Sequence, residues 1–230
     1  MEATRPTRIS KWAVACLEAI AREGLGTAIS LGRALGLMHY LDYRETRDVD
    51  AWWSAGSSAA EKEKLLSVVE ETLSSFGTVE RRSWGDVVSL DLREKEEVVF
   101  SFQVASRSAL LESSVRAPWV DVPVDSLSDL LASKMVALVE RGAPRDFRDI
   151  YMACSAGLAT AGDCWQLWQR RQAASKSDTD QDRPRLAVET HLQRIASHRP
   201  LETISDAESR SEAERVRAWF KGEFLDALSD

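Results

Sequence analysis

The spacing of apolar residues in the first third of the chain predicts helices around one short strand. In SKWAVACLEAIAREG, residues 10–24, apolar side chains recur at helical intervals, with Ser10 as the N-cap and Gly24 as the stop signal. Three further elements follow in order: a glycine turn that opens a second helix at 24–41, a strand DVDAWW at 48–53, and an amphipathic helix at 58–77.

From residue 78 the pattern changes to the alternation of apolar and polar residues that is typical of β-strands. The strand candidates are TVERRSW at 78–84, DVVSLDLR at 86–93, EVVFSFQVAS at 97–106 and WVDVPV at 119–124. The rest of the chain has helical spacing, apart from the polar tract at 175–184. We therefore predict an α+β protein with an α/β core at residues 1–125 and a helical region at residues 126–230.

Composition and charge describe an ordinary globular protein, with 44% hydrophobic and 29% charged residues. The net charge of −7 means that a nucleic-acid contact would need a local basic patch. Residues 183–199 are such a stretch, with four arginines against one glutamate, although a solvated helix face is the simpler interpretation.

Cysteine and histidine usage bears on compartment and on metal chemistry. The three cysteines, Cys16, Cys154 and Cys164, lack metal-type spacing and favour a reducing cytosol, and only three histidines are available for a zinc site. We find no signal peptide and no apolar run long enough to span a bilayer. We expect a cytoplasmic protein without a membrane partner.

Two aspartates in the predicted strand at 48–53 are the first candidates for chemistry. Asp48 and Asp50 are two positions apart, so on a strand they share one face with Cα atoms roughly 6–7 Å apart. Two carboxylates held that close repel each other unless a cation lies between them, and Mg²⁺ prefers carboxylate and phosphate oxygens. For the Asp-x-Asp pattern alone, two solvated carboxylates on an edge strand remain the better interpretation.

A glycine turn lies about twenty residues before this strand. Gly26 and Thr27 precede the predicted second helix, whose free N–H groups and positive dipole end attract phosphate. Glycine before a helix is usually only a cap. A phosphate-binding turn beside a metal-binding strand is nevertheless the combination that phosphoryl or nucleotidyl transfer needs.

Lys134 is a further candidate, because it lies on the apolar face of a predicted helix. This face is formed by Leu127, Leu131, Lys134, Leu138 and Arg141. An ammonium ion there is costly unless it is paired, and for an isolated lysine the simpler interpretation is a side chain that extends its charged end to water. With the two aspartates and the glycine turn, a triphosphate partner becomes the better account. In the next predicted helix, the simplest role for Asp149 is a surface pair with Arg145.

Two segments resemble one known family. GTAISL followed by RETRDVDAW resembles the first motif of the AbiEii/AbiGii-type nucleotidyltransferase toxins of abortive-infection systems, within the DNA polymerase β-like nucleotidyltransferase superfamily. This motif covers Gly26, Thr27, Arg44, Thr46, Asp48 and Asp50; Leu25 stands where a second glycine is common and Thr46 replaces a serine. LLASKMVALVERGAPRDFRDIYMA resembles a later motif of the same family, which covers Lys134, Arg141, Arg145, Asp146 and Asp149.

The resemblance implies a polymerase β-like domain, with a mixed sheet flanked by helices and a helical carboxy-terminal region. It implies that Asp48 and Asp50 bind Mg²⁺, or Mn²⁺ in its place, and that Lys134 and Asp149 complete the catalytic centre. The implied nucleotide-binding residues are Gly26, Thr27, Arg44, Thr46, Arg141 and Arg145. Asp149 is the first choice for a third catalytic carboxylate and Asp91 the second, because the strand at 97–106 offers Gln103 where an acid is expected.

The function implied is transfer of a nucleoside monophosphate from a nucleoside triphosphate to an acceptor, with tRNA as one candidate. The biological role would be the toxin of a toxin–antitoxin or phage-defence pair, with a cognate antitoxin as partner. Gln103 favours one alternative, a catalytically silent member that binds nucleotide or a partner protein. A second alternative is an interaction protein whose aspartate pair is only solvated.

Overall fold

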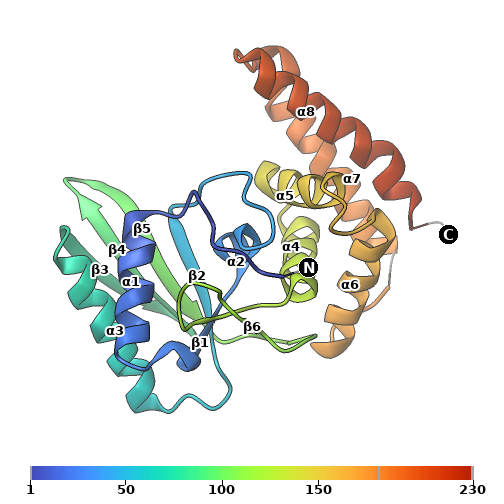
Figure 1. Cartoon of the computed structure of the whole chain (residues 1–230). Helices are drawn as coiled ribbons and strands as arrows, with labels where there is room; N and C mark the ends of the chain where they lie inside the picture. The colour runs from blue at the N-terminus through green and yellow to red at the C-terminus, as the bar shows by residue number, and fades with distance from the viewer. Residues whose placement is uncertain (1, 181, 229–230) are drawn as a thin grey trace. The chain divides into compact units, whose positions relative to one another are not determined.

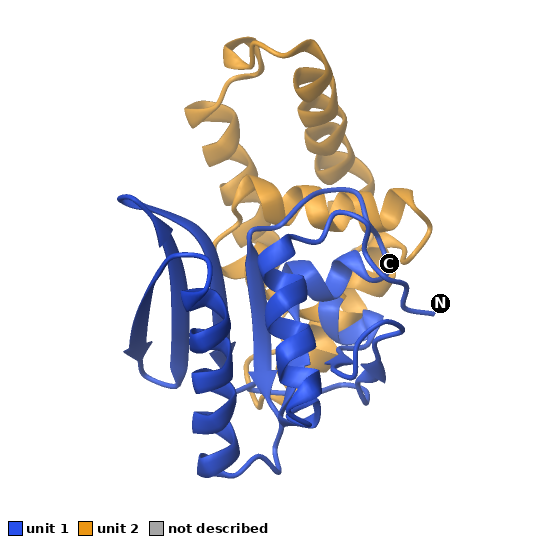
Figure 2. Cartoon of the chain, turned by 60° about the vertical axis from the view of Figure 1, so that its left-hand side comes forward, with its two compact units in different colours: residues 1–130 blue, residues 131–230 orange. Residues whose placement is uncertain are grey.

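The computed structural model describes residues 2–180 and 182–228 of the 230-residue chain. The chain divides into two compact units, 1–130 and 131–230, which Figure 2 shows in separate colours. The boundary falls inside α4 (Leu127–Glu140), so one continuous helix carries residues of both units.

The first unit combines helices and strands, whereas the elements described in the second unit are helical. The helices of the first unit are α1 (Lys11–Arg22), a 3₁₀ helix (Gly26–Ala28), α2 (Arg33–Met38), α3 (Ala59–Ser74) and the start of α4. Its strands are β1 (Ile29–Leu31), β2 (Asp48–Trp53), β3 (Thr78–Trp84), β4 (Val87–Glu94), β5 (Glu97–Ala105), β6 (Val115–Arg116) and β7 (Pro123–Val124). The second unit continues with α5 (Pro144–Ser155), α6 (Ala161–Ala174), α7 (Asp182–His198), a 3₁₀ helix (Leu201–Thr203), α8 (Ala207–Trp219) and a π-helical turn (Phe220–Phe224).

A seven-stranded mixed sheet organises the first unit, in the order β3-β4-β5-β2-β1-β7-β6. β2 is parallel to β5 and β1 is parallel to β7, whereas the other four neighbouring pairs are antiparallel. This mixed sheet with its helices confirms the predicted α+β class.

Alternation along the strands gives the sheet one apolar face and one polar face. α1 and α3 cover the apolar face (Figure 1). Leu17 of α1, Leu65 of α3 and Phe100 and Phe102 of β5 belong to one buried cluster there, each at most 1% exposed. The opposite face carries the aspartates of β2.

Local capping determines where the two covering helices begin. The Ser10 hydroxyl accepts a hydrogen bond of 3.2 Å from the N–H of Ala13 at the start of α1. Ser58 and Glu61 form a reciprocal capping box at the start of α3. Both helices therefore begin where the sequence signals predicted.

The helix predicted at 24–41 is wrong in its first half. Residues 29–31 form β1 between β2 and β7, with all three residues buried, and helix α2 starts only at Arg33. The run Ala-Ile-Ser-Leu bonds its backbone within the sheet, so strand pairing overrides the local helical spacing. The strand predicted at 119–124 is reduced to the two residues of β7.

The second unit has an aromatic core of its own. Phe220 contacts the rings of Phe147 and Phe224 at centroid distances of 4.7 and 4.5 Å. Trp165 lies 4.9 Å from Phe224, and its indole N–H donates to the carbonyl oxygen of the same residue. Helices α5, α6 and the π-helical turn are thus joined by aromatic packing.

Candidate active site

Strand β2 carries both aspartates of the Asp-x-Asp pattern on the polar face of the sheet. Val49, Ala51 and Trp53 point into the core, each at most 8% exposed, so Asp48 and Asp50 point to the other side. On the parallel neighbour β5, Ser101 is in register with Asp48 and Gln103 is in register with Asp50. The predicted pair of carboxylates therefore exists, and its neighbours on β5 are polar and uncharged.

The residues that lead into β2 support its first aspartate. The N–H of Asp48 donates to the Thr46 hydroxyl at 3.3 Å. Arg44 donates through Nε to the Tyr43 hydroxyl at 3.2 Å, and its Cζ lies 5.9 Å from the Tyr43 ring centroid. Thr46 thus helps to set the start of the strand, and Arg44 packs on a tyrosine close to it in sequence.

A turn that we did not predict lies beside Asp50. The N–H of Gly32 donates to the backbone carbonyl of Asp50 at 2.9 Å. The Arg33 guanidinium pairs with the Asp50 carboxylate at 2.9 Å. In the sequence, this turn is marked only by a Gly-Arg pair directly before the apolar helical run ALGLM. That pair indicates a turn less clearly than the two closely spaced glycines at 24 and 26 do.

Gly26 and Thr27 do not lie at this turn. β1 is antiparallel to β2 with Ile29 opposite Trp53, so Gly26 and Thr27 precede the end of β1 that is remote from Asp50. A Cβ atom on Gly26 would come within 1.7 Å of the Asp121 carbonyl oxygen. Close backbone packing therefore explains Gly26, and the expectation that this turn opens a helix beside the aspartates is corrected.

Asp91 of β4 is buried in a network of hydrogen bonds on the polar face. Ser89 and Ser101 donate to its Oδ1 at 2.7 and 2.5 Å, and Arg82 pairs with Oδ2. Burial by itself would raise the pKa of this carboxyl, but the hydrogen bonds from Ser101, Ser89 and Arg82 outweigh it and hold the pKa below its usual range. β5 separates β4 from β2, so Asp91 lies roughly 10 Å across the sheet from the β2 aspartates.

In the second unit, Lys134 of α4 and Asp149 of α5 form a buried ion pair. Lys134 Nζ lies 2.5 Å from Asp149 Oδ2, and the side chains are 7% and 1% exposed. The alternative of a lysine that extends its charged end to water is therefore wrong. A surface role for Asp149 is wrong as well, because that carboxylate is buried.

The arginines of the second motif differ in their surroundings. Arg141 binds Asp146 through two parallel hydrogen bonds of 2.8 and 2.9 Å, and Asp146 also accepts from the N–H of Ala143 at 3.1 Å. This fork geometry is the strong form of an arginine–carboxylate pair. Arg145, on the first turn of α5, is exposed. The second motif thus contains two ion pairs, one between α4 and the middle of α5 and one between the residue after α4 and the first turn of α5.

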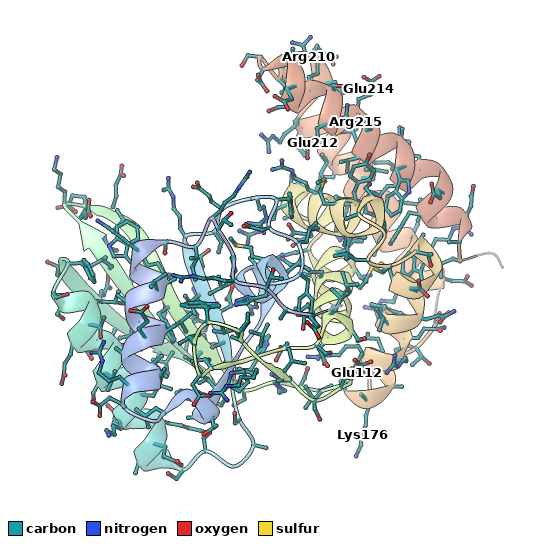
Figure 3. All side chains as sticks on the ribbon, in the orientation of Figure 1. Glu112, Lys176, Arg210, Glu212, Glu214 and Arg215 are labelled. Carbon is teal, nitrogen blue, oxygen red and sulfur yellow. The ribbon has the colours of Figure 1, made fainter. Side chains whose placement is uncertain are left out.

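Each unit also contains a cavity away from these ion pairs. In the first unit a cavity of about 630 Å³ lies at the Trp53 end of β2, with Ser30, Lys62 and Arg107 among its lining residues. In the second unit a cavity of about 220 Å³ is lined by residues of α5, α7 and α8, including Arg148 and Glu212, which pair at 2.5 Å. Figure 3 labels Glu212 on α8.

A family model described as "Nucleotidyl transferase AbiEii toxin, Type IV TA system" matches residues 26–227. The chain belongs to this family. The match includes both motifs on which the resemblance rested, and the resemblance is confirmed. In this chain the first motif runs from the 3₁₀ helix Gly26–Ala28 to β2, and the second runs from α4 to α5.

One solved structure supports the fold. A candidate nucleotidyltransferase from H. pylori aligns with a TM-score of 0.53 and 17% identity over 94% of this chain and 94% of that chain. An antigenic nucleotidyltransferase-like protein from Paracoccidioides brasiliensis aligns less well, with a TM-score of 0.41 and 15% identity over 88% and 91% of the two chains. No curated protein matches the chain. Among the described residues, no helix is long and apolar enough to cross a membrane.

The β2 aspartates supply donor groups of the type that a magnesium ion prefers. Mg²⁺ is usually held by one or two carboxylates together with substrate phosphates and water. Asp48 and Asp50 supply two carboxylates on one face, and Asp48 is exposed. Within residues 2–180 and 182–228, no group of three or more Asp, Glu, His or Cys side chains is arranged to hold a metal. The donor set thus suits an ion that shares its coordination with phosphate oxygens.

Proposed function

We propose that the protein transfers a nucleoside monophosphate from a nucleoside triphosphate to an acceptor hydroxyl, with Mg²⁺ bound by Asp48 and Asp50. The observation that carries this proposal is the pair of carboxylates on the polar face of β2, beside the Gly32–Arg33 turn. Membership of a nucleotidyl transferase family supplies the reaction class.

In this reaction the acceptor oxygen attacks the α-phosphorus. A bond from that oxygen to phosphorus forms, and the hydroxyl proton passes to a carboxylate or to water. The bond from phosphorus to the oxygen bridging to the β-phosphate breaks, and pyrophosphate leaves. Bound Mg²⁺ supplies charge neutralisation for the phosphates. Such in-line transfer depends mainly on positioning and electrostatics, so two fixed carboxylates and nearby cations are the residue types it needs.

We assign further roles by motif and by position. From the second motif we carry over Lys134 as the residue expected to neutralise phosphate charge, and Asp149, its ion-pair partner, as the first choice for the third carboxylate. Gly32 allows the turn to pack beside Asp50, and its N–H is engaged by the Asp50 carbonyl. Asp91 accepts hydrogen bonds from Ser89 and Ser101, and we assign it the role of positioning Ser101 on β5.

At the level of the cell, we propose a cytoplasmic toxin whose action a cognate antitoxin opposes. An RNA acceptor, with tRNA as the leading candidate, is compatible with the exposed arginines Arg183 and Arg194 of α7 and Arg199 directly after it. The nucleotide is one of the four ribonucleoside triphosphates.

The test is transfer of label from each of the four α-³²P-labelled nucleoside triphosphates onto total RNA and onto the protein itself. Each reaction is run with Mg²⁺, with Mn²⁺ and with a chelator. We expect label with one nucleotide, loss of label with the chelator, and loss in Asp48→Ala. Asp226→Ala, which removes an exposed carboxylate near the carboxy terminus, is the matched control and should keep full activity.

Gln103 favours a second candidate function, a catalytically silent member that binds Mg²⁺ and nucleotide. An amide in register with Asp50 cannot accept the acceptor's proton as a carboxylate would. This candidate predicts that the protein binds Mg²⁺–nucleotide, and that Asp48→Ala abolishes binding, while no label is transferred with any of the four nucleotides.

A further inference from the structure

Arg33 occupies a carboxylate that the proposed function assigns to a metal. Its Nη1 lies 2.9 Å from Asp50 Oδ1, and the two side chains are 44% and 15% exposed. A guanidinium stays charged at every physiological pH, so Arg33 supplies the positive charge that two neighbouring aspartates require. This cation is an arginine of the chain itself.

The backbone at this turn directs the arginine toward Asp50. Arg33 has φ +46°, in the left-handed region that residues with a Cβ rarely adopt. The preceding Gly32 packs so closely on Trp52 that a Cβ atom would lie 2.2 Å from the indole nitrogen. The guanidinium carbon of Arg33 in turn lies 5.3 Å from the centroid of the Trp52 ring. The packing of Gly32 on Trp52 and the contact of Arg33 with the same ring thus hold Arg33 in its strained backbone conformation. Strained backbone conformations of this kind are often retained at functional sites.

Arg33 and a metal ion compete for the same carboxylate. Mg²⁺ binds carboxylate oxygen directly, so at Asp50 it would meet a carboxylate that already holds a guanidinium, and the two positive charges repel each other. The Arg33 side chain is nearly half exposed and can move without unpacking the core. Guanidinium geometry also suits phosphate oxygens, which a Mg²⁺–nucleotide brings to the same place.

We propose that Arg33 is a positioning residue that holds Asp50 when no nucleotide is bound and exchanges Asp50 for the nucleotide phosphates when Mg²⁺–nucleotide enters. This role rests on the proposed function of Asp48 and Asp50. It lowers the affinity of the site for metal alone and raises the affinity for metal and nucleotide together. The nucleotide phosphates accept the guanidinium that the metal displaces, so binding of one ligand favours binding of the other.

The test measures Mn²⁺ binding by electron paramagnetic resonance and nucleotide binding by calorimetry, with α,β-methylene nucleotides that cannot transfer. Arg33→Ala should bind Mn²⁺ roughly two- to fivefold more tightly than wild type without nucleotide, the range expected for a half-exposed ion pair. The same variant should bind Mg²⁺–nucleotide more weakly. Opposite shifts of the two affinities are the signature of exchange, because a merely structural role would move both in the same direction or neither.

Two further variants serve as controls for the loss of the guanidinium. Arg33→Gly also removes the guanidinium but relieves the backbone strain, so it should show the same two shifts in a protein at least as stable as wild type. Arg81→Ala removes an arginine that pairs with Glu63 on another part of the same unit, and should change neither affinity.

The outcomes separate this proposal from the proposed function. Unchanged Mn²⁺ affinity in both Arg33 variants, with intact nucleotide binding in wild type, overturns the role of Arg33 and leaves the proposed function standing. Tighter Mn²⁺ binding in the variants, with no nucleotide binding by wild type, supports the hold on Asp50 and refutes the nucleotide site. Absence of Mn²⁺ binding in all proteins overturns both.

Discussion

At the scale of single residues, the molecule satisfies its buried charges in pairs. Asp149 is paired with Lys134, Asp146 with Arg141, and Asp91 with Arg82. A buried charge that loses its partner keeps its desolvation penalty without compensation, so deletion of one member of a pair is far more costly than replacement of both.

The Lys134–Asp149 pair gives the sharpest prediction on stability. Asp149→Ala leaves the buried ammonium of Lys134 without a carboxylate, and we expect the free energy of unfolding to fall by about 3–5 kcal/mol. The double variant Lys134→Met, Asp149→Leu should recover most of this loss in urea unfolding, although it is inactive in the transfer assay. Arg185→Ala, which breaks the partly exposed pair with Glu189 on α7, should change the free energy by only about 0.5 kcal/mol or less. Equal losses in the single and double variants would contradict this account.

The sequence allowed the residue types of the site to be predicted, and their partners only in part. The alternation in DVDAWW was enough to place Asp48 and Asp50 on one face. The apolar stripe on α4 identified Lys134 as a lysine that needs a partner. Two local interpretations competed with this pairing: a lysine that extends its charged end to water, and an Asp149 that pairs with Arg145 on the surface. Its pairing with a residue fifteen positions later depends on how α4 and α5 pack, which no local pattern encodes.

At the scale of elements, the two glycine turns before β2 have different tasks. Gly26 allows a close approach of the chain to the Asp121 carbonyl, and Gly32 allows the turn to pack on Trp52 beside Asp50. Sequence spacing could not separate these tasks, because both glycines precede apolar runs that a helix or a strand can use. Only the insertion of β1 into the sheet decides which turn lies next to the aspartates.

Substitution of Gly26 tests this division. Gly26→Ala forces a Cβ atom against backbone, which cannot move aside as a side chain can, and should lower the free energy of unfolding by about 1–3 kcal/mol. The variant that remains folded should bind Mg²⁺–nucleotide like wild type, as calorimetry can measure. Gly222→Ala, where nothing lies within 4 Å of the added atom, is the control for stability. Loss of nucleotide binding with an unchanged free energy of unfolding would instead show that Gly26 contributes to phosphate binding.

At the scale of the whole molecule, the two units have separate cores. The buried cluster between the sheet, α1 and α3 belongs to residues of the first unit, and the aromatic cluster around Phe220 belongs to the second. Units with their own cores open as separate cooperative segments. The family and the α+β class could be predicted from the sequence, because both rest on motifs and periodicity.

Two buried cysteines can report on the units independently. Cys16 and Cys164 are both 0% exposed. Burial raises the pKa of the Cys16 thiol to about 12, and the hydrogen bond to Cys154 together with burial raises that of Cys164. Both thiols should resist alkylation until their unit unfolds, since the thiolate is the reactive form.

We expect pulsed alkylation in increasing urea, read by mass spectrometry of peptides, to give different midpoints for Cys16 and Cys164. Cys154, which is only partly buried, should be modified first under native conditions and serves as the internal control for reagent. Coincident midpoints would show that α4, which runs through the boundary, makes the chain a single cooperative unit.

The terminal strand β3 has a consequence for self-association. It stands at one end of the strand order, where unpaired backbone groups can recruit a strand from another molecule. Arg81 is paired with Glu63 of α3, and Arg82 is paired with Asp91 of β4. Charged side chains on an outer strand oppose the addition of a further strand. The arginine that fixes Asp91 therefore also protects the sheet from aggregation, so a change at Arg82 affects solubility as well as the polar face.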